Sequence, residues 1–155
     1  MKAKHLRLVM NLWPPFAFSG IRVQRIADDF SAVQVALHQR WYNRNYVGSH
    51  FGGSLFAMTD PFFMMMLLHQ LGSDYIVWDK AAHIEFVKPG RGTVTAHFHL
   101  DAGTVATLRA AVDRGERVRH WFEATIHDSD GEVVANVRKQ LYIRHKRPAE
   151  GSDQP

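Results

Sequence analysis

One acidic residue stands alone in a long apolar segment of this chain. Asp60 is the only ionisable residue between Gly52 and Leu68, where leucine, phenylalanine and methionine predominate. A carboxylate moved from water into an apolar environment costs several kcal/mol unless it is paired or its pKa shifts. A carboxyl group buried in such a place is a candidate general base or nucleophile.

The pair Gly52-Gly53 at the start of the same segment is a second chemical candidate. The first amides of a helix have no partner inside the helix, and the helix dipole makes them attractive to negative charge. Glycine also lets a ligand approach the backbone closely. Asp60 lies eight positions after Gly52, which is about 12 Å along a regular helix. One carbonyl group cannot contact both, so a joint site needs Gly52 of one subunit to face Asp60 of another.

Every candidate also has a purely structural interpretation. Asp60 precedes Pro61, and this pair is typical of a helix start with Asp60 as the N-cap. Because a residue before proline avoids the helical conformation, a helix that begins at Gly53 would need a kink at Asp60. The glycine pair could equally be a flexible joint, Asn45 a turn residue and His50 a packed or loop histidine.

Hydrophobic periodicity predicts the elements that position these residues. A helix without a polar face must be enclosed by other structure, and strands with alternating apolar and polar residues have one packed face and one wet face. Such alternation occurs in two segments before the apolar helix and four after it: Ile21–Gln24, Val33–His38, Ile76–Val87, Val94–Leu100, Val118–Ile126 and Val133–Ile143. A curled antiparallel sheet wrapped around a long central helix satisfies both requirements. The sequence therefore predicts an α+β protein with the hotdog fold.

The other segments complete a single expected domain over residues 1–145. Asp128–Gly131 is typical of a hairpin turn, and Thr104–Val112 of a short connecting helix. Residues 146–155 are polar, and we expect a flexible tail there. We expect residues 1–20 to form an amphipathic helix and a proline-containing lead-in, with an apolar stripe made of Leu6, Leu8, Val9 and Leu12.

Composition narrows the classes of function. The chain has 155 residues, a formal net charge of +4 and no cysteine, which excludes disulfides and thiolate chemistry. We expect neither a metal nor a cofactor. Without an arginine-rich block, an apolar run of about 20 residues or a secretory signal pattern, we expect no nucleic-acid partner, no membrane span and a cytoplasmic location. A curled sheet exposes an edge strand, so we expect edge pairing in a homodimer, which a second dimer could extend to a homotetramer.

The spacing of Asn45, Gly52-Gly53 and Asp60 is similar to the pattern of hotdog acyl-CoA thioesterases of the phenylacetyl-CoA thioesterase type. The segment Gly52–Asp60 resembles the glycine pair and helix of that family almost position by position, and His83–Gly90 resembles its third strand. More broadly, Asn11–Ile143 resembles a small bacterial hotdog branch, described mainly as candidate thioesterases or as a domain of unknown function.

The resemblance implies hydrolysis of an acyl thioester carried by CoA or by an acyl-carrier protein. It implies that the backbone N–H of Gly52 polarises the thioester carbonyl and that Asp60 acts as general base or nucleophile. Asn45 would orient water or substrate. Independently, thioester hydrolysis develops an oxyanion, which helix-terminal amides can stabilise. Further expected substrate contacts are Gly53, His50 and Phe56.

One position departs from the family pattern. The family has histidine directly before the glycine pair, whereas this chain has Phe51 there and His50 one residue earlier. This departure leaves a non-catalytic acyl-thioester binder as an alternative. A second alternative is an acyl-thioester dehydratase or hydratase, which uses a histidine and a carboxylate as acid and base. Ser49-His50-Phe51 faintly resembles the Gly-His-Phe motif of acyl-carrier-protein dehydratases.

Basic residues are concentrated in the second half of the chain. Lys88 and Arg91 flank the turn Pro89-Gly90, which follows the strand expected beside the central helix. Two cations at a rigid turn could attract a diphosphate. We therefore predict that the phosphates of the carrier dock on Lys88 and Arg91, with a merely solvated charged surface as the alternative.

Overall fold

The protein is described by a computed structural model, in which residues 1–146 are described; the expected C-terminal tail lies, from residue 147 onward, outside the described residues. Its helices are α1 (Ala3–Leu12), α2 (Pro14–Ala17), α3 (Gly52–Ala57), α4 (Phe62–Leu71) and α5 (Ala102–Asp113), with a short 3-10 turn η1 (Trp41–Asn43). Its strands are β1 (Ile21–Ile26), β2 (Ala32–His38), β3 (Tyr75–Phe86), β4 (Thr93–His99), β5 (Val118–His127) and β6 (Val133–His145).

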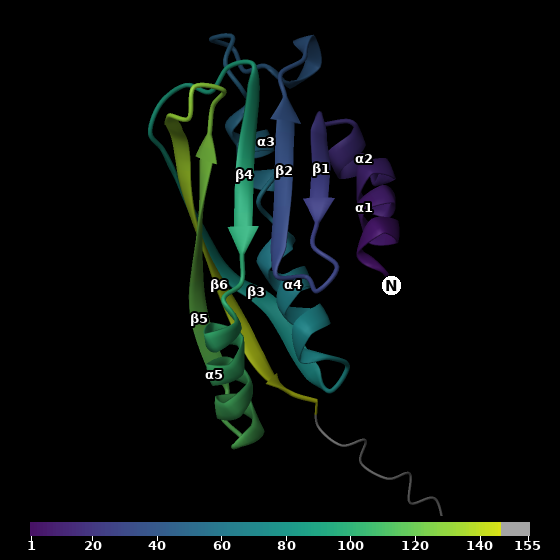
Figure 1. The fold of residues 1–155 in the computed structure, drawn as a ribbon. Helices are drawn as coiled ribbons and strands as arrows, with labels where there is room; N and C mark the ends of the chain where they lie inside the picture. Colours follow the sequence, from purple (N-terminus) through teal and green to yellow (C-terminus); the bar gives the residue numbers. More distant parts are fainter. Residues whose placement is uncertain (147–155) are drawn as a thin grey trace, which may run out of the picture.

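All strands belong to one antiparallel sheet with the order β1-β2-β4-β5-β6-β3. Figure 1 shows this sheet curling around α3 and α4, with α5 near the lower end of β5 and β6. The apolar residues that alternate in the sequence line the inner face, as Val33, Val35 and Leu37 do in β2. The predicted α+β hotdog fold is confirmed.

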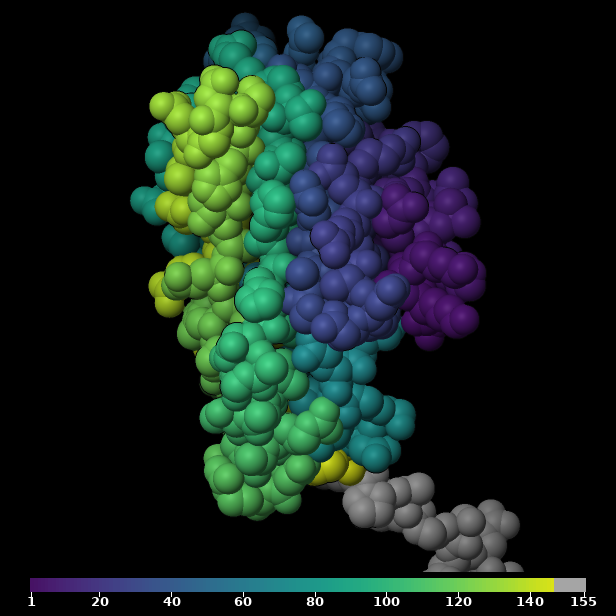
Figure 2. Space-filling view, in the orientation of Figure 1, coloured from purple at the N-terminus to yellow at the C-terminus, as the bar shows by residue number. Residues whose placement is uncertain are grey.

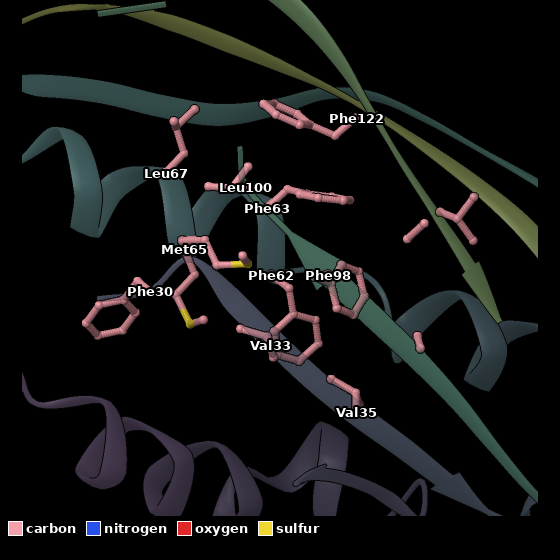
Figure 3. Close-up of a cluster of buried hydrophobic side chains, with 14 of the residues drawn as sticks. Phe30, Val33, Val35, Phe62, Phe63, Met65, Leu67, Phe98, Leu100 and Phe122 are labelled. Atoms are coloured by element: carbon pink, nitrogen blue, oxygen red, sulfur yellow. The ribbon is translucent and has the colours of Figure 1, made fainter. Parts of the chain in front are cut away.

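Aromatic packing fixes α4 inside the curl of the sheet. Phe62 and Phe63 start this helix and are almost completely buried. Their rings lie 4.9 Å from Phe98 on β4 and 5.0 Å from Phe122 on β5, centroid to centroid (Figure 3). Each such buried side chain contributes about 1.5–3 kcal/mol of hydrophobic stabilisation. The start of α4, and with it the preceding turn, is therefore held firmly.

The apolar central segment is broken in the middle. Helix α3 ends at Ala57 and α4 begins at Phe62, with a turn at residues 58–61. Pro61 causes this break, because proline lacks an N–H group and disfavours helical geometry at the preceding residue. The kink expected at Asp60 is thus present, whereas one continuous helix is not. The alternative of Asp60 as an N-cap is wrong, because Pro61 occupies that position and no side chain caps α4.

The first helix packs through a different face than predicted. Ala3 and Met10 are buried, whereas Leu8, Val9 and Leu12 are 59%, 54% and 71% exposed. The proposed stripe was therefore wrong at these three positions. The reason is a tertiary contact: the Asn11 side chain donates to the carbonyl of Val23 at 3.0 Å and accepts from its amide at 2.8 Å. This clamp on β1 decides which face of α1 meets the sheet.

The two edge strands of the sheet differ in how far other elements cover them. Helix α1 lies along β1, as the purple segments beside the blue strands show in Figure 2. At the other edge, β3 pairs only with β6 and is exposed over most of its length from Trp78 onward. An uncovered strand of this length presents unpaired backbone groups that can pair with another chain. No helix among the described residues is long and apolar enough to cross a bilayer.

Candidate active site

The carboxylate of Asp60 is paired with a buried lysine. In the turn between α3 and α4, its Oδ1 accepts a hydrogen bond from Nζ of Lys139 at 2.8 Å. The Lys139 side chain is 2% exposed, whereas that of Asp60 is 59% exposed. The expectation of a buried Asp60 is therefore wrong: the break in the helix turns the carboxylate outward, and the buried partner is the lysine.

A third charged group completes this cluster. Oδ2 of Asp79 on β3 lies 3.3 Å from Nζ of Lys139. Burial raises the pKa of Asp79, and the nearby charge of Asp60 adds to the rise, while Lys139 acts in the opposite direction. One ammonium group thus serves two carboxylates that come from different elements.

The sheet register explains how these groups meet. Lys139 follows the same alternation as Val137 and Leu141, so it points to the inner face of β6. Its register partner on β3 is Ala82. A register shift between Asp79 and Ala81 inserts one extra residue into β3. Because of this extra residue, Asp79 and Ala82, which pair with Leu141 and Lys139, both face the inner side of the sheet.

Sequence analysis missed Lys139 and Asp79. The signal for Lys139 was present, because a lysine interrupts the apolar register Val137, Leu141, Ile143 at a core position. Lysine is almost never fully buried unless it is paired. That rule indicates a missing anionic partner but does not say which carboxylate supplies it.

The predicted site residues other than Arg91 line two separate pockets. A pocket of about 380 Å³ is lined by Asn45, His50, Gly52 and Lys88, among others. A second pocket, of about 250 Å³, is lined by Gly53, Phe56 and Asp60 together with Trp13, Pro15, Phe16 and Ala57. The two pockets share no lining residue. Within one chain, Gly52 and Asp60 therefore line different pockets.

A side chain at either glycine would crowd a neighbouring aromatic ring. A Cβ atom at Gly52 would lie 3.0 Å from the ring of Phe86, and one at Gly53 would lie 2.3 Å from the ring of Phe51. Helix α3 starts at Gly52 without a side-chain cap. Its first amides have no intrahelical acceptor, and Gly52 is a lining residue of the first pocket.

Asn45 organises the loop before the glycine pair. Its Nδ2 donates to Ser49 Oγ at 2.8 Å and to the His50 carbonyl at 3.2 Å. Its Oδ1 accepts from the amides of Val47 and Ser49. The side-chain amide is therefore fully used in holding the loop, which is the turn role considered from the sequence.

The imidazole ring of His50 is buried, which disfavours its charged form. It is 2% exposed, and its Nε2 lies 2.8 Å from the carbonyl of Gly92. Since a carbonyl only accepts, Nε2 carries the proton, and Nδ1 is a buried acceptor without a partner among the described residues. Burial lowers the pKa of the ring. The imidazole therefore supports the loop rather than presenting a charge.

The two predicted phosphate contacts differ in their surroundings. Lys88 forms ion pairs with Asp128, at 2.6 Å, and with Glu132. The hydrogen bonds to these two carboxylates raise its pKa. Arg91 is exposed, and its only hydrogen bond within the described part of the chain is to the Gly48 carbonyl at 3.2 Å. Lys88 is thus paired with two carboxylates of the protein, whereas Arg91 has no carboxylate partner within residues 1–146.

A metal centre is not assembled by the residues that the structure covers. In residues 1–146, no three histidine, aspartate or glutamate side chains gather closely enough to hold an ion. The acidic residues of the cluster are instead bridged by an ammonium group.

Several solved structures share this fold. A Pseudomonas aeruginosa protein of unknown function, described as a probable thioesterase, matches with a TM-score of 0.79 and 21% identity over 92% of this chain and 95% of its own. A Haemophilus influenzae thioesterase matches with a TM-score of 0.69 and 12% identity over 97% and 96%. A mutant Pseudomonas aeruginosa thioesterase gives 0.67 and 14% over 92% and 94%. Identities this low establish the fold and leave the activity open.

At the level of sequence, curated proteins give no match to this chain. A family model does match, and it spans residues 2–143. This range runs from the residue before α1 almost to the end of β6, and it includes Asp60, Asp79 and Lys139. The chain therefore belongs to the family described as Domain of unknown function (DUF4442).

Proposed function

We propose that this protein hydrolyses acyl thioesters, with Asp60 as the reacting carboxylate. The observation that carries the proposal is the state of Asp60: it is exposed in a pocket, yet held at one oxygen by a buried lysine. A carboxylate that only stabilises the fold has no need of a solvent-facing pocket. The shared fold with proteins described as thioesterases supports the same reaction class.

The Asp60 carboxylate and the Gly52 amide suit two routes of thioester hydrolysis. As a general base, Asp60 takes a proton from water while the water oxygen bonds to the carbonyl carbon. The C–S bond then breaks, and the departing thiolate receives the proton. As a nucleophile, Asp60 bonds to the carbonyl carbon, the thiolate leaves, and water hydrolyses the resulting anhydride. In both cases the amide of Gly52 stabilises the oxyanion.

The complete site takes residues from two subunits. Gly52 and Asp60 line different pockets in one chain, so a single carbonyl reaches both only when a second copy is present. The uncovered edge strand β3 offers the surface for that copy, and the apolar residues exposed near it include Phe51, Phe86 and Val87. Pairing of two β3 edges in a homodimer would cover these side chains.

The substrate carries its acyl group on CoA or on an acyl-carrier protein. Phe56 and Gly53 line the Asp60 pocket and provide an apolar wall. At the other pocket, Arg91 follows the lining residues Lys88–Gly90, has no carboxylate partner within residues 1–146, and would contact a phosphate of the carrier. Lys88 is assigned to the protein's own ion pairs.

The decisive experiment is an assay of the purified protein against acyl-CoA thioesters of several chain lengths, with release of free thiol as the readout. Turnover that disappears in Asp60→Asn supports the proposal. Saturable binding of the same thioesters without any release of thiol would instead identify a non-catalytic binder. Absence of both turnover and binding would overturn the proposed function.

A further inference from the structure

Lys139, the buried lysine of the cluster, takes no part in the bond-making steps of the proposed reaction. Lys139 is the only buried Lys, Arg, Asp or Glu within residues 1–146. Burying an ammonium group costs several kcal/mol unless nearby charges compensate. An apolar residue at this core position of β6 would avoid that cost, so the lysine calls for a role that an apolar residue cannot fill.

The geometry directs the ammonium group at the reacting carboxylate. Lys139 donates to Oδ1 of Asp60, and the other oxygen, Oδ2, has no donor within residues 1–146. The ring of Phe56 lies 5.9 Å from Nζ on the pocket side. The lysine thus holds one carboxylate oxygen and leaves the second one without a donor within residues 1–146, on an exposed residue that lines a pocket together with Phe56.

A buried partner orients a carboxylate better than a surface partner does. An exposed ion pair must immobilise two long side chains, and that entropy cost cancels much of its benefit. Here the lysine is already fixed by burial between β6 and β3, opposite Ala82. Only the short side chain of Asp60 remains to be ordered, so its orientation follows that of the lysine.

Asp79 draws on the same ammonium group. Its Oδ2 is 3.3 Å from Nζ, longer than the 2.8 Å contact to Asp60. The charged groups that face Asp79 are Lys139 on β6 and Asp60 in the α3–α4 turn. Helix α4, which packs against β3, has His69 as its only titratable residue, and that ring is bonded to the carbonyl of Met65. Asp60, Asp79 and Lys139 therefore form one cluster of interacting charges.

We propose that Lys139 is a positioning residue that orients Asp60 for attack on the thioester, and that Asp79 competes with Asp60 for the ammonium group of Lys139. This inference rests on the proposed function for its catalytic consequence, but the cluster itself can be tested without any activity. When Asp79 is ionised, Lys139 forms ion pairs with both Asp60 and Asp79. When Asp79 is protonated, Lys139 forms an ion pair with Asp60 alone.

The first test is kinetic and compares the buried lysine with an exposed one. Lys139→Met removes the ammonium group and keeps most of the length of the side chain. Lys4→Met is the control, because Lys4 is exposed on α1, at the sheet edge opposite β3. We expect Lys139→Met to lower kcat by roughly 10- to 100-fold, as misplacement of a reacting group does, with KM changed by less than about 3-fold. Lys4→Met should behave like the wild type, and Lys139→Arg should recover part of the lost kcat.

An unchanged kcat in a folded Lys139→Met protein would overturn the positioning role. Equal losses in Lys139→Met and Lys139→Arg, with both proteins folded, would also count against an electrostatic hold. Circular dichroism and thermal unfolding establish the folded state. If Lys139→Met does not fold, Lys139→Gln replaces it, and the split between kcat and KM is read in that variant.

The second test measures the cluster directly by carboxyl carbon NMR titration of Asp79. Removal of the lysine in Lys139→Met or Lys139→Gln should raise the pKa of Asp79, because a favourable charge is lost. Removal of the competing charge in Asp60→Asn should lower it. A pKa of Asp79 that moves in neither variant overturns the shared cluster. If the wild type hydrolyses no thioester while these shifts occur, the proposed function fails and the cluster stands.

Discussion

Asp60 and Lys139 are 79 positions apart in the sequence, and their side chains meet at 2.8 Å across the inner face of the sheet. The contact joins the break in the central helix to the middle of β6. Through this contact, a buried ammonium group holds an exposed carboxylate by a hydrogen-bonded ion pair. Most of the expected behaviour of the site depends on this pair.

The exchange Asp60→Asn should abolish thioester turnover and leave the fold intact. The amide keeps the shape of the carboxylate but can neither accept a proton nor attack, and Asp79 remains as a partner for Lys139. We expect less than about a tenth of the wild-type kcat to remain, with near-normal binding of acyl-CoA by calorimetry. Asp130→Asn in the β5–β6 hairpin, where the residue is exposed, is the matched control. Full turnover in the Asp60 variant would remove this residue from the chemistry.

The exchange Gly52→Pro should abolish turnover by removing one amide proton. Proline is well tolerated at the first position of a helix, and Gly52 is the first residue of α3. Gly52→Ala is the control, because it crowds Phe86 in a similar way but keeps the N–H group. We expect initial-rate measurements to find activity in the alanine variant alone. Similar losses in both would trace the effect to crowding.

Mixed dimers should recover activity if each site is built from two chains. In a dimer of Asp60→Asn with Gly52→Pro, one of the two sites keeps both intact groups and the other loses both. Random subunit exchange at equal amounts makes half of the dimers mixed, so about a quarter of the wild-type activity is expected. Exchange is verified by native mass spectrometry. No recovery after verified exchange would show that one chain suffices.

Charge reversal at Arg91 should weaken binding of the carrier and spare the chemistry. Arg91→Glu should raise KM for acyl-CoA by about 3- to 10-fold and flatten its dependence on salt, because a phosphate contact is replaced by repulsion. Lys88→Met is the informative comparison, since Lys88 is already neutralised by Asp128 and Glu132. Its effect should fall on thermal stability and leave KM unchanged. A short thioester without the nucleotide should not distinguish Arg91→Glu from the wild type; if it does, the arginine acts through the fold.

Acidification should weaken the fold through His50. Burial lowers the pKa of this ring below its ordinary value of 6.5, so the unfolded chain binds a proton in a pH range where the folded protein does not. The free energy of unfolding must therefore fall as the pH drops from about 6.5 towards the lowered pKa. His50→Gln removes this titration. Urea unfolding at about pH 7 and pH 5 should show a smaller loss in the variant, and parallel losses would contradict the assignment.

The sequence alone was sufficient for the architecture. Strand alternation and the apolar helix depend on local periodicity, which the burial of Val33, Val35 and Leu37 reproduces residue by residue. Pro61 likewise determines the break in the helix through its own covalent ring. Asp60 stood out for the same local reason, since it is the one ionisable residue of an apolar segment.

Tertiary structure decided which groups meet. The apolar residues of α1 permit more than one buried face, and only the clamp of Asn11 on Val23 selects the face with Ala3 and Met10. The ion pairs of Lys88 also depend on tertiary structure, because Asp128 and Glu132 lie about 40 positions away from it along the chain.

The same distinction holds for the reacting group. The sequence marked Asp60 as unusual but placed it inside the core, whereas the fold exposes it and buries Lys139 instead. Periodicity assigns a side chain to a face of its own element and contains no information about the element opposite. The partner of a charge is chosen by strand register and by the bulge in β3, which exist only once distant segments have packed together.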